Sequence, residues 1–84
     1  MLLDVVELAV DADEYSLLLV YKNGERRRFD MTPCLELKPW RRLRSRYLFE
    51  RAFIEHGTVA WPGNIDIAPE TLYRESYAYD SEAV

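Results

Sequence analysis

The residues able to carry out chemistry are few and scattered along this 84-residue chain. His56 is its only histidine and Cys34 its only cysteine, which excludes an internal disulfide and a cysteine-rich zinc site. A reactive thiol would need a nearby base, and the sequence leaves open whether His56 lies close to Cys34. We expect His56 to occupy a turn and Cys34 to be a small packed residue.

Two aspartates lie between apolar neighbours, Asp30 in Phe-Asp-Met and Asp66 in Ile-Asp-Ile. Paired carboxylates can perform general acid–base catalysis, but aspartate also serves turns and helix starts by accepting backbone hydrogen bonds. We expect the structural role for both. The three glycines lie in separate turns, so there is no glycine-rich phosphate loop. The sequence predicts no enzyme, and no catalytic, cofactor-binding or metal-binding residues.

Four arginines lie in residues 40–47, a segment that begins at Trp40 and ends at Tyr47. Arginine binds phosphate or carboxylate through paired hydrogen bonds, and aromatic rings can stack on bases. Alternatively, Trp40, Leu43 and Tyr47 share one helical stripe and face the core. A second arginine cluster occupies residues 26–28. The candidate interaction surface combines the two clusters with two strand residues: Arg26, Arg28, Arg41, Arg42, Arg44, Arg46, Leu18 and Val20.

Charge is unevenly distributed, although the net charge is only −4. Residues 1–21 hold five acids and no Lys or Arg, whereas residues 22–51 hold ten of the eleven bases. Residues 52–84 are again acidic. Either the basic middle pairs with its acidic flanks in the fold, or it meets an acidic partner or nucleic acid. The overall acidity disfavours general nucleic-acid affinity.

Composition and length predict one folded domain over residues 1–84. A hydrophobic content of 49% is too high for a disordered chain. No apolar run approaches the roughly 20 residues that a membrane helix needs, and the first residues do not resemble a secretion signal. We therefore expect a cytoplasmic protein without membrane contact, whose tail frays over about residues 79–84.

Alternating apolar residues predict a first strand near residues 5–10 and a clear second strand over 15–21, followed by an Asn23-Gly24 turn and a third strand over 25–31. A two-residue turn would place arginines on the face of Leu17 and Leu19. A three-residue loop with a left-handed Gly24 would instead place Phe29 opposite Leu17. Because a one-residue slip inverts the face, we predict the three-residue loop.

That register leaves Leu18 and Val20 on the outer face, among arginines. We expect either the C-terminal helix of the chain or a second subunit to cover this pair, and we favour the helix.

The second half of the sequence predicts a connector over residues 32–39 and a short helix capped by Ser45. A hairpin follows, with strands at 53–55 and 58–61. Pro62 ends the second strand, and a helix begins at Pro69, with Leu72, Tyr73, Ser76 and Tyr77 at helical spacing. The fold class is α+β, mostly antiparallel sheet, in the order β-β-β, short helix, β-β, C-terminal helix.

Five motifs follow one another over about residues 3–73: an alternating strand ending in an aromatic, an Asn-Gly turn, an apolar-Asp-apolar triplet, a spaced Leu and Phe, and a closing Trp-Pro motif. Their residues are Leu17, Leu19, Tyr21, Asn23, Gly24, Phe29, Asp30, Met31, Leu43, Phe49, Trp61, Pro62, Gly63, Asn64, Asp66, Ile67, Pro69, Glu70, Leu72 and Tyr73. With these motifs the chain resembles a prokaryotic family called domain of unknown function 2442. The chain departs from the family in three places. Its Gly63-Asn64 turn stands where Asn-Gly is more usual, Ala68 stands where a capping residue is usual, and Leu18 and Val20 replace residues that are usually polar.

The resemblance implies a compact α+β domain. Members of this family occur alone or joined to a helix-turn-helix domain, often encoded beside small proteins that resemble ribonuclease-type toxins. We therefore expect a non-catalytic protein-interaction module with an antitoxin-like or adaptor role. Its partner would be a small toxin-like protein or a second copy of the chain. The alternative is a small nucleic-acid-binding protein that uses residues 40–47.

Overall fold

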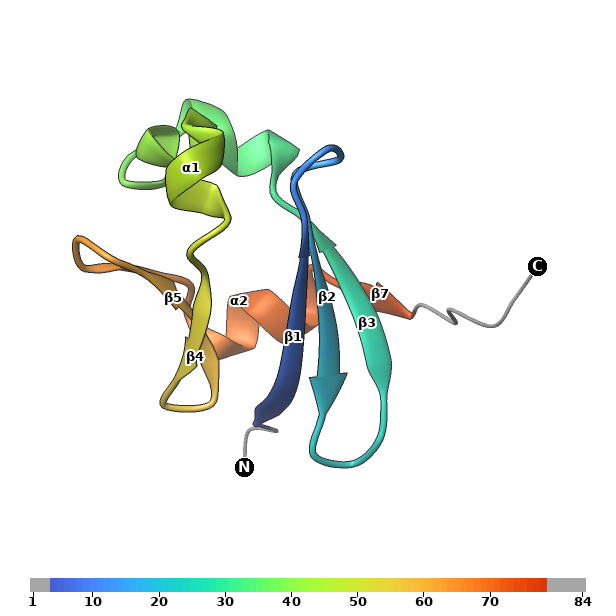
Figure 1. Ribbon diagram of the computed structural model, residues 1–84. Helices are drawn as coiled ribbons and strands as arrows, with labels where there is room; N and C mark the ends of the chain where they lie inside the picture. The colour runs from blue at the N-terminus through green and yellow to red at the C-terminus, as the bar shows by residue number, and fades with distance from the viewer. Residues whose placement is uncertain (1–3, 79–84) are drawn as a thin grey trace.

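The computed structural model describes residues 4–78, which form two antiparallel sheets joined by short helical segments (Figure 1). The tail expected to fray lies outside the described residues. In chain order the elements are β1 (Val5–Asp11), β2 (Ser16–Tyr21), β3 (Arg26–Asp30), η1 (Thr32–Glu36), η2 (Trp40–Arg44), α1 (Arg46–Phe49), β4 (Phe53–Glu55), β5 (Thr58–Trp61), β6 (Ile65–Asp66), α2 (Pro69–Arg74) and β7 (Tyr77–Ala78). The predicted α+β class is confirmed.

The β2–β3 hairpin has the predicted register, with Leu17 opposite Phe29. Its loop is residues 22–24: the Tyr21 amide donates to the Glu25 carbonyl at 2.9 Å, and Gly24 has a φ of 92°. Glycine suits this left-handed position because it has no Cβ to clash with the backbone. The three-residue loop therefore turns Leu17, Leu19, Tyr21 and Phe29 to one face, where all four are buried.

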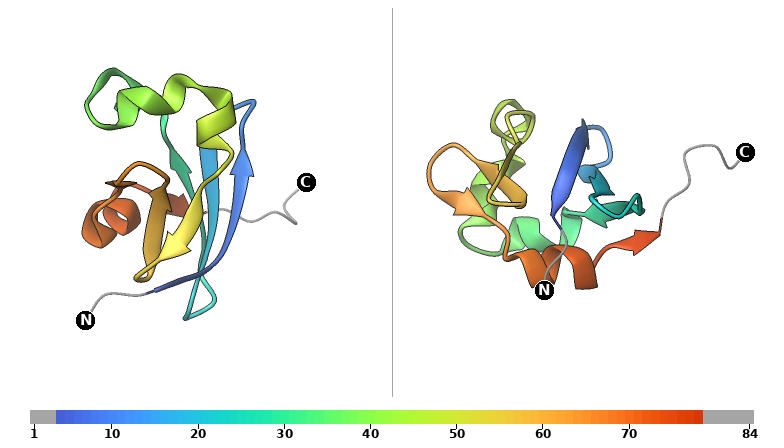
Figure 2. Two further views of the ribbon diagram at one scale, coloured as in Figure 1. Left: turned by 60° about the vertical axis from the view of Figure 1, so that its left-hand side comes forward. Right: turned by 90° about the horizontal axis from the view of Figure 1, so that it is seen from below.

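The core lies between the two sheets, whose strand orders are β1-β2-β3-β7 and β4-β5-β6. Leu17, Leu19 and Phe29 enter it from the first sheet, and Val59 and Trp61 enter it from the second. Seen from below, α2 runs from the three-stranded sheet toward β3 and β7 (Figure 2). Its Leu72 is 1% exposed and belongs to the same core.

Three short helical segments, η1, η2 and α1, form a cap at one end of the sheets (Figures 1 and 2). The Lys38–Pro39 peptide bond between η1 and η2 is cis. Ser45 caps α1 as predicted, since its hydroxyl accepts from the Leu48 amide at 3.4 Å. Leu43 and Phe49 of the cap are fully buried and close the core from above.

Three positions differ from the sequence-based prediction. Tyr47 is 69% exposed rather than part of an inward stripe, because the helix breaks at Ser45 and the inward side chain after the break is Phe49. Tyr15 is a left-handed turn residue with a φ of 50°, not part of β2. Tyr77 lies in β7 rather than on α2, because the helix ends at Arg74.

The C-terminal helix packs on the inner face of the four-stranded sheet, so the prediction that it covers Leu18 and Val20 is wrong. The Tyr73 ring meets the inward-facing Tyr21 ring edge-on, with centroids 5.2 Å apart. The apolar core lies on the inner face of the sheet. The apolar stripe of α2 buries more surface there than it would against Leu18 and Val20 on the outer face. The outer face keeps Leu18 and Val20 half-buried.

Candidate interaction surfaces

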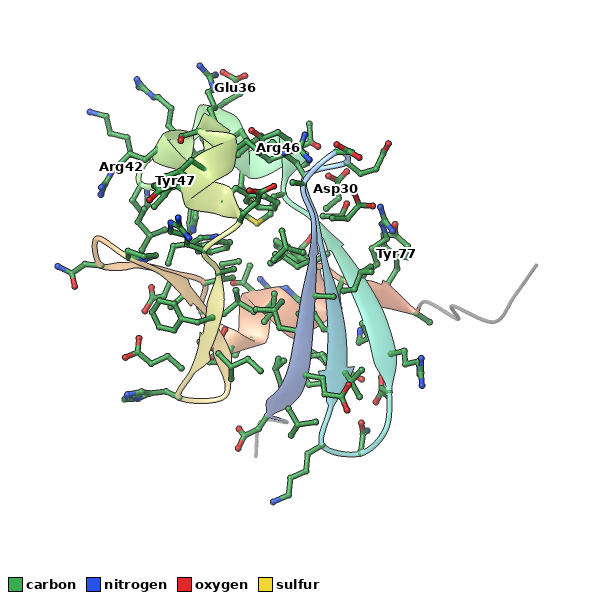
Figure 3. All side chains as sticks on the ribbon, viewed as in Figure 1. Asp30, Glu36, Arg42, Arg46, Tyr47 and Tyr77 are labelled. Carbon is green, nitrogen blue, oxygen red and sulfur yellow. The ribbon has the colours of Figure 1, made fainter. Side chains whose placement is uncertain are left out.

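The structure divides the predicted interaction surface between two places. Four arginines lie on the cap, Arg41, Arg42 and Arg44 in η2 and Arg46 in α1. The other members, Arg26, Arg28, Leu18 and Val20, lie on the outer face of the four-stranded sheet. In Figure 3 Arg42 and Tyr47 lie on the side of the cap away from that sheet, and Arg46 lies toward the β1–β2 turn. The two surfaces therefore have to be considered separately.

Part of the cap is neutralised within the chain. Arg44 pairs with Glu36 at 2.7 Å and donates from Nε to the Leu35 carbonyl at 3.1 Å. Arg46 pairs with Asp13 at 2.9 Å and with Glu50 at 3.0 Å. The hydrogen bond with Glu50, and then the charge of Asp13, raise the pKa of Arg46. These two arginines follow the intramolecular alternative, in which the basic middle pairs with nearby acids.

Four other cations lie in the cap or directly beside its helical segments and have no such partner in the described part of the chain. Lys38, Arg41, Arg42 and Arg51 are exposed, and no carboxylate within residues 4–78 forms an ion pair with them. Arg42 donates to the Gly63 carbonyl at 3.3 Å, and the Arg51 guanidinium lies 3.9 Å from the centroid of the exposed Tyr47 ring. We call these four cations and Tyr47 the cationic cap surface.

Trp40 belongs to the support of this surface rather than to its exposed part. It is half-buried against the core, and its Nε1 donates to the Asp66 carbonyl at 3.0 Å. That bond fastens η2 to β6, so the cap and the three-stranded sheet hold each other in place.

The outer face of the four-stranded sheet carries alternate residues of each strand. In the register, Val20 lies between Glu7 and Arg26, and Leu18 lies between Ala9 and Arg28. Leu18, Val20 and Ala9 line a shallow hollow of about 210 Å³ that Glu7 and Arg26 border. Arg28 is bonded to Asp11 at 3.2 Å along the same face.

The candidate chemical residues are divided between separate parts of the fold. Asp30 and Asp66 belong to different sheets, and the Asp30 carboxylate accepts from the Thr32 amide at 2.9 Å at the start of η1. Burial, with the charges of Asp30 and Glu75, raises the pKa of the Cys34 thiol. His56 is an exposed residue of the turn between β4 and β5. This turn lies at the end of the molecule opposite the cap, whereas Cys34 belongs to η1 of the cap (Figure 1). Within residues 4–78 no three His, Cys, Asp or Glu side chains converge as a metal site would require.

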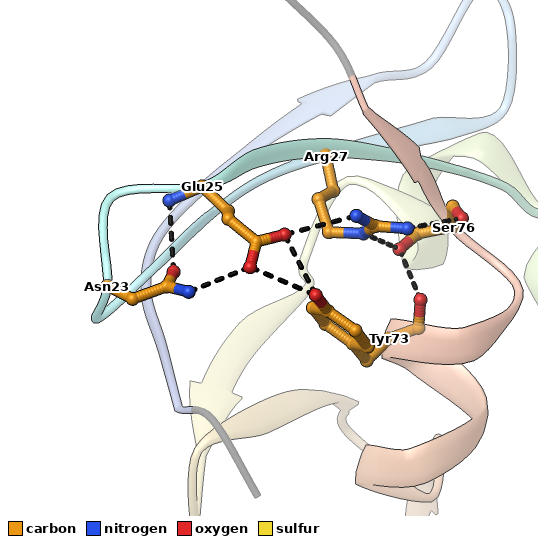
Figure 4. Close-up of polar contacts among 5 residues, drawn as sticks. All are labelled: Asn23, Glu25, Arg27, Tyr73 and Ser76. Carbon is orange, nitrogen blue, oxygen red and sulfur yellow. Dashed lines mark hydrogen bonds and ion pairs between the residues drawn. The ribbon is translucent and has the colours of Figure 1, made fainter.

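A polar network that the sequence does not predict joins the β2–β3 hairpin to the C-terminal helix (Figure 4). Arg27 lies on the inner face and donates from Nε to the Ser76 hydroxyl at 2.6 Å and from Nη2 to the Ser76 carbonyl at 2.8 Å. Its Nη1 meets Glu25 at 3.1 Å, and its guanidinium lies 4.4 Å from the Tyr73 ring centroid. Glu25 also accepts from Asn23 at 2.7 Å and from the Tyr73 hydroxyl at 2.9 Å.

Hydrogen bonds set the electrostatics of this network. Those from Asn23 and Tyr73 hold the pKa of the Glu25 carboxyl below its usual value, with Arg27 adding to the effect. Because Glu25 accepts a hydrogen bond from the Tyr73 hydroxyl, it raises the pKa of that hydroxyl. The residues around Arg27 in the sequence do not indicate its bond to Ser76, because Ser76 lies 49 residues away.

Tyr21 lies beside this network but its hydroxyl finds no hydrogen-bond partner among the described residues. Burial raises its pKa from 10.0 to about 12. The proton is thus held more tightly in the folded state than in the unfolded state. The contribution of Tyr21 to stability is complete below pH 10.0 and is lost as the pH rises toward about 12.

Replacing Tyr21 with phenylalanine is expected to leave the free energy of unfolding unchanged or raise it by up to about 1 kcal/mol, because a buried unpaired hydroxyl is removed. The alkaline loss of stability should also become smaller in this variant. Urea unfolding on both sides of pH 10.0 measures both effects, with Tyr47→Phe on the exposed surface as the matched control. A clear loss of stability at neutral pH would show that the hydroxyl has a partner after all.

Comparison with known proteins assigns this chain to a family. The model of the family described as "Protein of unknown function (DUF2442)" matches residues 5–78. The chain belongs to DUF2442. No curated protein and no solved structure matches the chain. No helix within the described part of this DUF2442 domain is long and apolar enough to cross a membrane.

Proposed function

We propose that this DUF2442 domain is a non-catalytic protein-interaction module that binds an acidic surface of a partner protein through the cationic cap surface. The observation that supports the proposal is that Lys38, Arg41, Arg42 and Arg51 are exposed and form no ion pair with a carboxylate of residues 4–78. A partner carboxylate can therefore bind these groups without first displacing one from that part of the chain.

The chemistry of the surface suits a protein partner. Arginine and tyrosine are among the residue types most enriched at the positions that dominate protein–protein binding energy. The Arg51 guanidinium packs on one face of the Tyr47 ring and restricts its motion. The ring therefore loses less conformational entropy on binding. Trp40 and Leu43 fix the backbone beneath, since the first bonds to β6 and the second is fully buried. The surface is thus preorganised.

We propose that the domain acts as an antitoxin-like or adaptor protein, which works by binding its partner stoichiometrically. The resemblance of the chain supports this finer role, and the cap supplies a surface that could perform it. Electrostatic complementarity would mainly raise the association rate and exclude basic partners.

A second candidate function is the binding of single-stranded nucleic acid. The exposed Tyr47 ring beside the cations of the cap favours it, because bases stack on such rings while cations hold the phosphates. The net charge of −4 weighs against it, since the rest of the surface would repel a polyanion. We rank it below the protein partner for that reason.

The decisive experiment compares two double variants with the same change in charge. Lys38→Glu with Arg41→Glu alters the cationic cap surface, and Lys22→Glu with Arg74→Glu alters exposed residues of the β2–β3 loop and α2. Each variant and the wild type would serve as bait in a host lysate, with and without nuclease. The captured protein would then be purified and its affinity measured against salt concentration.

We expect the wild type and the Lys22/Arg74 variant to bind one protein stoichiometrically. The Lys38/Arg41 variant should lose at least about tenfold in affinity, because each substitution removes an attraction and adds a repulsion. Capture destroyed by nuclease, with a steep dependence of affinity on salt, would replace the proposal with the nucleic-acid alternative. Equal capture by both double variants would show that the cap is not the binding surface.

A further inference from the structure

The outer face of the four-stranded sheet is unusually apolar at its centre. An antiparallel sheet with one solvated face normally alternates apolar and polar residues along each strand. Strand β2 instead carries Leu17, Leu18, Leu19 and Val20 in succession, so that both of its faces are apolar. Leu17 and Leu19 enter the core, whereas Leu18 and Val20 line the hollow on the outer face. A strand of this composition is typical of a sheet that is covered on both sides.

We propose that the outer face of the four-stranded sheet is a homodimer interface, where a second copy of this chain packs face to face on Leu18 and Val20. The proposal concerns a different surface from the cationic cap and does not depend on the proposed function. Its argument is the charge pattern around the hollow, which is complementary to itself in one arrangement of the two copies.

Symmetry limits the arrangements to be considered. Two identical sheets packed face to face are related by a twofold axis that lies between them. The hollow is centred between the levels of Val20 and Leu18, because residues 7–9 and 18–20 line it together with Arg26. An axis running across the strands through that centre would exchange the two levels. Arg26 of one copy would then face Arg28 of the other, which is repulsive.

An axis parallel to the strands through the same centre gives the opposite result. It keeps each level in place and lays β1 of one copy over β3 of the other. Glu7 and Arg26 flank Val20 on β1 and β3, so Glu7 of each copy would face Arg26 of the other. Two such pairs would flank a centre formed by Leu18 and Val20 of both copies. Burial of these apolar side chains supplies the attraction, and the charge pairs select the orientation.

The arrangement also leaves the cap accessible. The cap lies beyond the end of β3 at which Asp30 is found, and an axis parallel to the strands keeps the corresponding ends of both copies on the same side (Figures 1 and 3). A dimer of this form would present two caps in the same direction.

Charge reversal with complementation tests the inference directly. Glu7→Arg would set two positive charges against each other across the interface, and Arg26→Glu would set two negative charges against each other at the same place. Each variant alone should therefore dimerise at least about tenfold more weakly than the wild type. In the heterodimer of the two variants the reversed residues face each other with opposite charges, so an equimolar mixture should associate more tightly than either variant alone. Sedimentation equilibrium from micromolar to millimolar concentration measures all three samples.

The mixture separates this inference from a simpler one. If Glu7 and Arg26 interacted only within one chain, mixing the two variants would restore nothing. Thermal unfolding of each variant checks that the monomer still folds, and Leu18→Lys should give a monomer by an independent route. A wild type that is monomeric throughout the concentration range, or single variants that dimerise as well as the wild type, would overturn the proposal.

Discussion

Replacing Trp61 with alanine is expected to unfold most of the protein at room temperature. Trp61 is 1% exposed, its ring stacks on Phe49 with centroids 6.1 Å apart, and its Nε1 donates to the Phe49 carbonyl at 3.0 Å. Truncation of a buried tryptophan costs about 3–5 kcal/mol, because it removes transfer free energy and leaves a cavity. A single core in a domain this small rarely provides more than about 3–5 kcal/mol in total.

The loss arises at the junction of the three-stranded sheet with the cap. Trp61 ends β5, and its bond to Phe49 ties that strand to the end of α1. Urea unfolding followed by far-ultraviolet circular dichroism measures the change. The matched control is Trp40→Ala, in which the truncated ring is only half-buried, although its Nε1 also bonds a carbonyl at 3.0 Å. Equal losses of unfolding free energy in the two variants would contradict the expectation that burial of the ring determines the size of the loss.

Replacing Arg27 with methionine is expected to lower the free energy of unfolding by about 2 to 3 kcal/mol, a range typical of hydrogen bonds to a charged group. Methionine keeps an unbranched apolar side chain but removes the bonds to Ser76 and Glu25. The Arg27 side chain is only 17% exposed, so water does not fully replace these partners. The Ser76 hydroxyl would keep its own bond to the Tyr73 carbonyl at 2.7 Å.

Two comparisons give this result its meaning. Arg74→Met removes an arginine whose pairing with Glu75, at 3.3 Å, is largely exposed, and it should change stability by no more than about 0.5 kcal/mol. The effects of Arg27→Met and Tyr73→Phe should not be additive, because both side chains bind Glu25. Additive effects would show that the residues act independently and that the network in Figure 4 is not cooperative.

Local patterns in the sequence were sufficient for most of the fold. The choice of a three-residue loop followed from placing Phe29 and Leu17 on one face, and the structure has that register. Ser45 and Pro69 marked two helix starts correctly, because capping and proline at the first turn depend on neighbours within a few residues. These features succeed because their physical causes are local.

Features that depend on distant residues were not predictable in the same way. The side of the sheet on which α2 packs is set by the whole core. Strand alternation turns Arg27 inward, but its partner Ser76 lies 49 residues away in the sequence. The cationic cap surface was predicted only in part. Arg41 and Arg42 were identified, but the pairing of Arg44 with Glu36 and of Arg46 with Asp13 requires the folded chain. The stacking of Arg51 on Tyr47 was not anticipated.

During synthesis, the β2–β3 hairpin leaves the ribosome long before the residues that hold it in place. Arg27 and Ser76 are 49 residues apart, which corresponds to roughly 2–10 s of translation at typical rates. A hairpin forms within microseconds but is marginally stable without further packing. Its face of Leu17, Leu19 and Tyr21 therefore stays exposed to other nascent chains and chaperones for seconds. Translation through α2 and Ser76, rather than the formation of the first strands, sets the time at which each new molecule can fold.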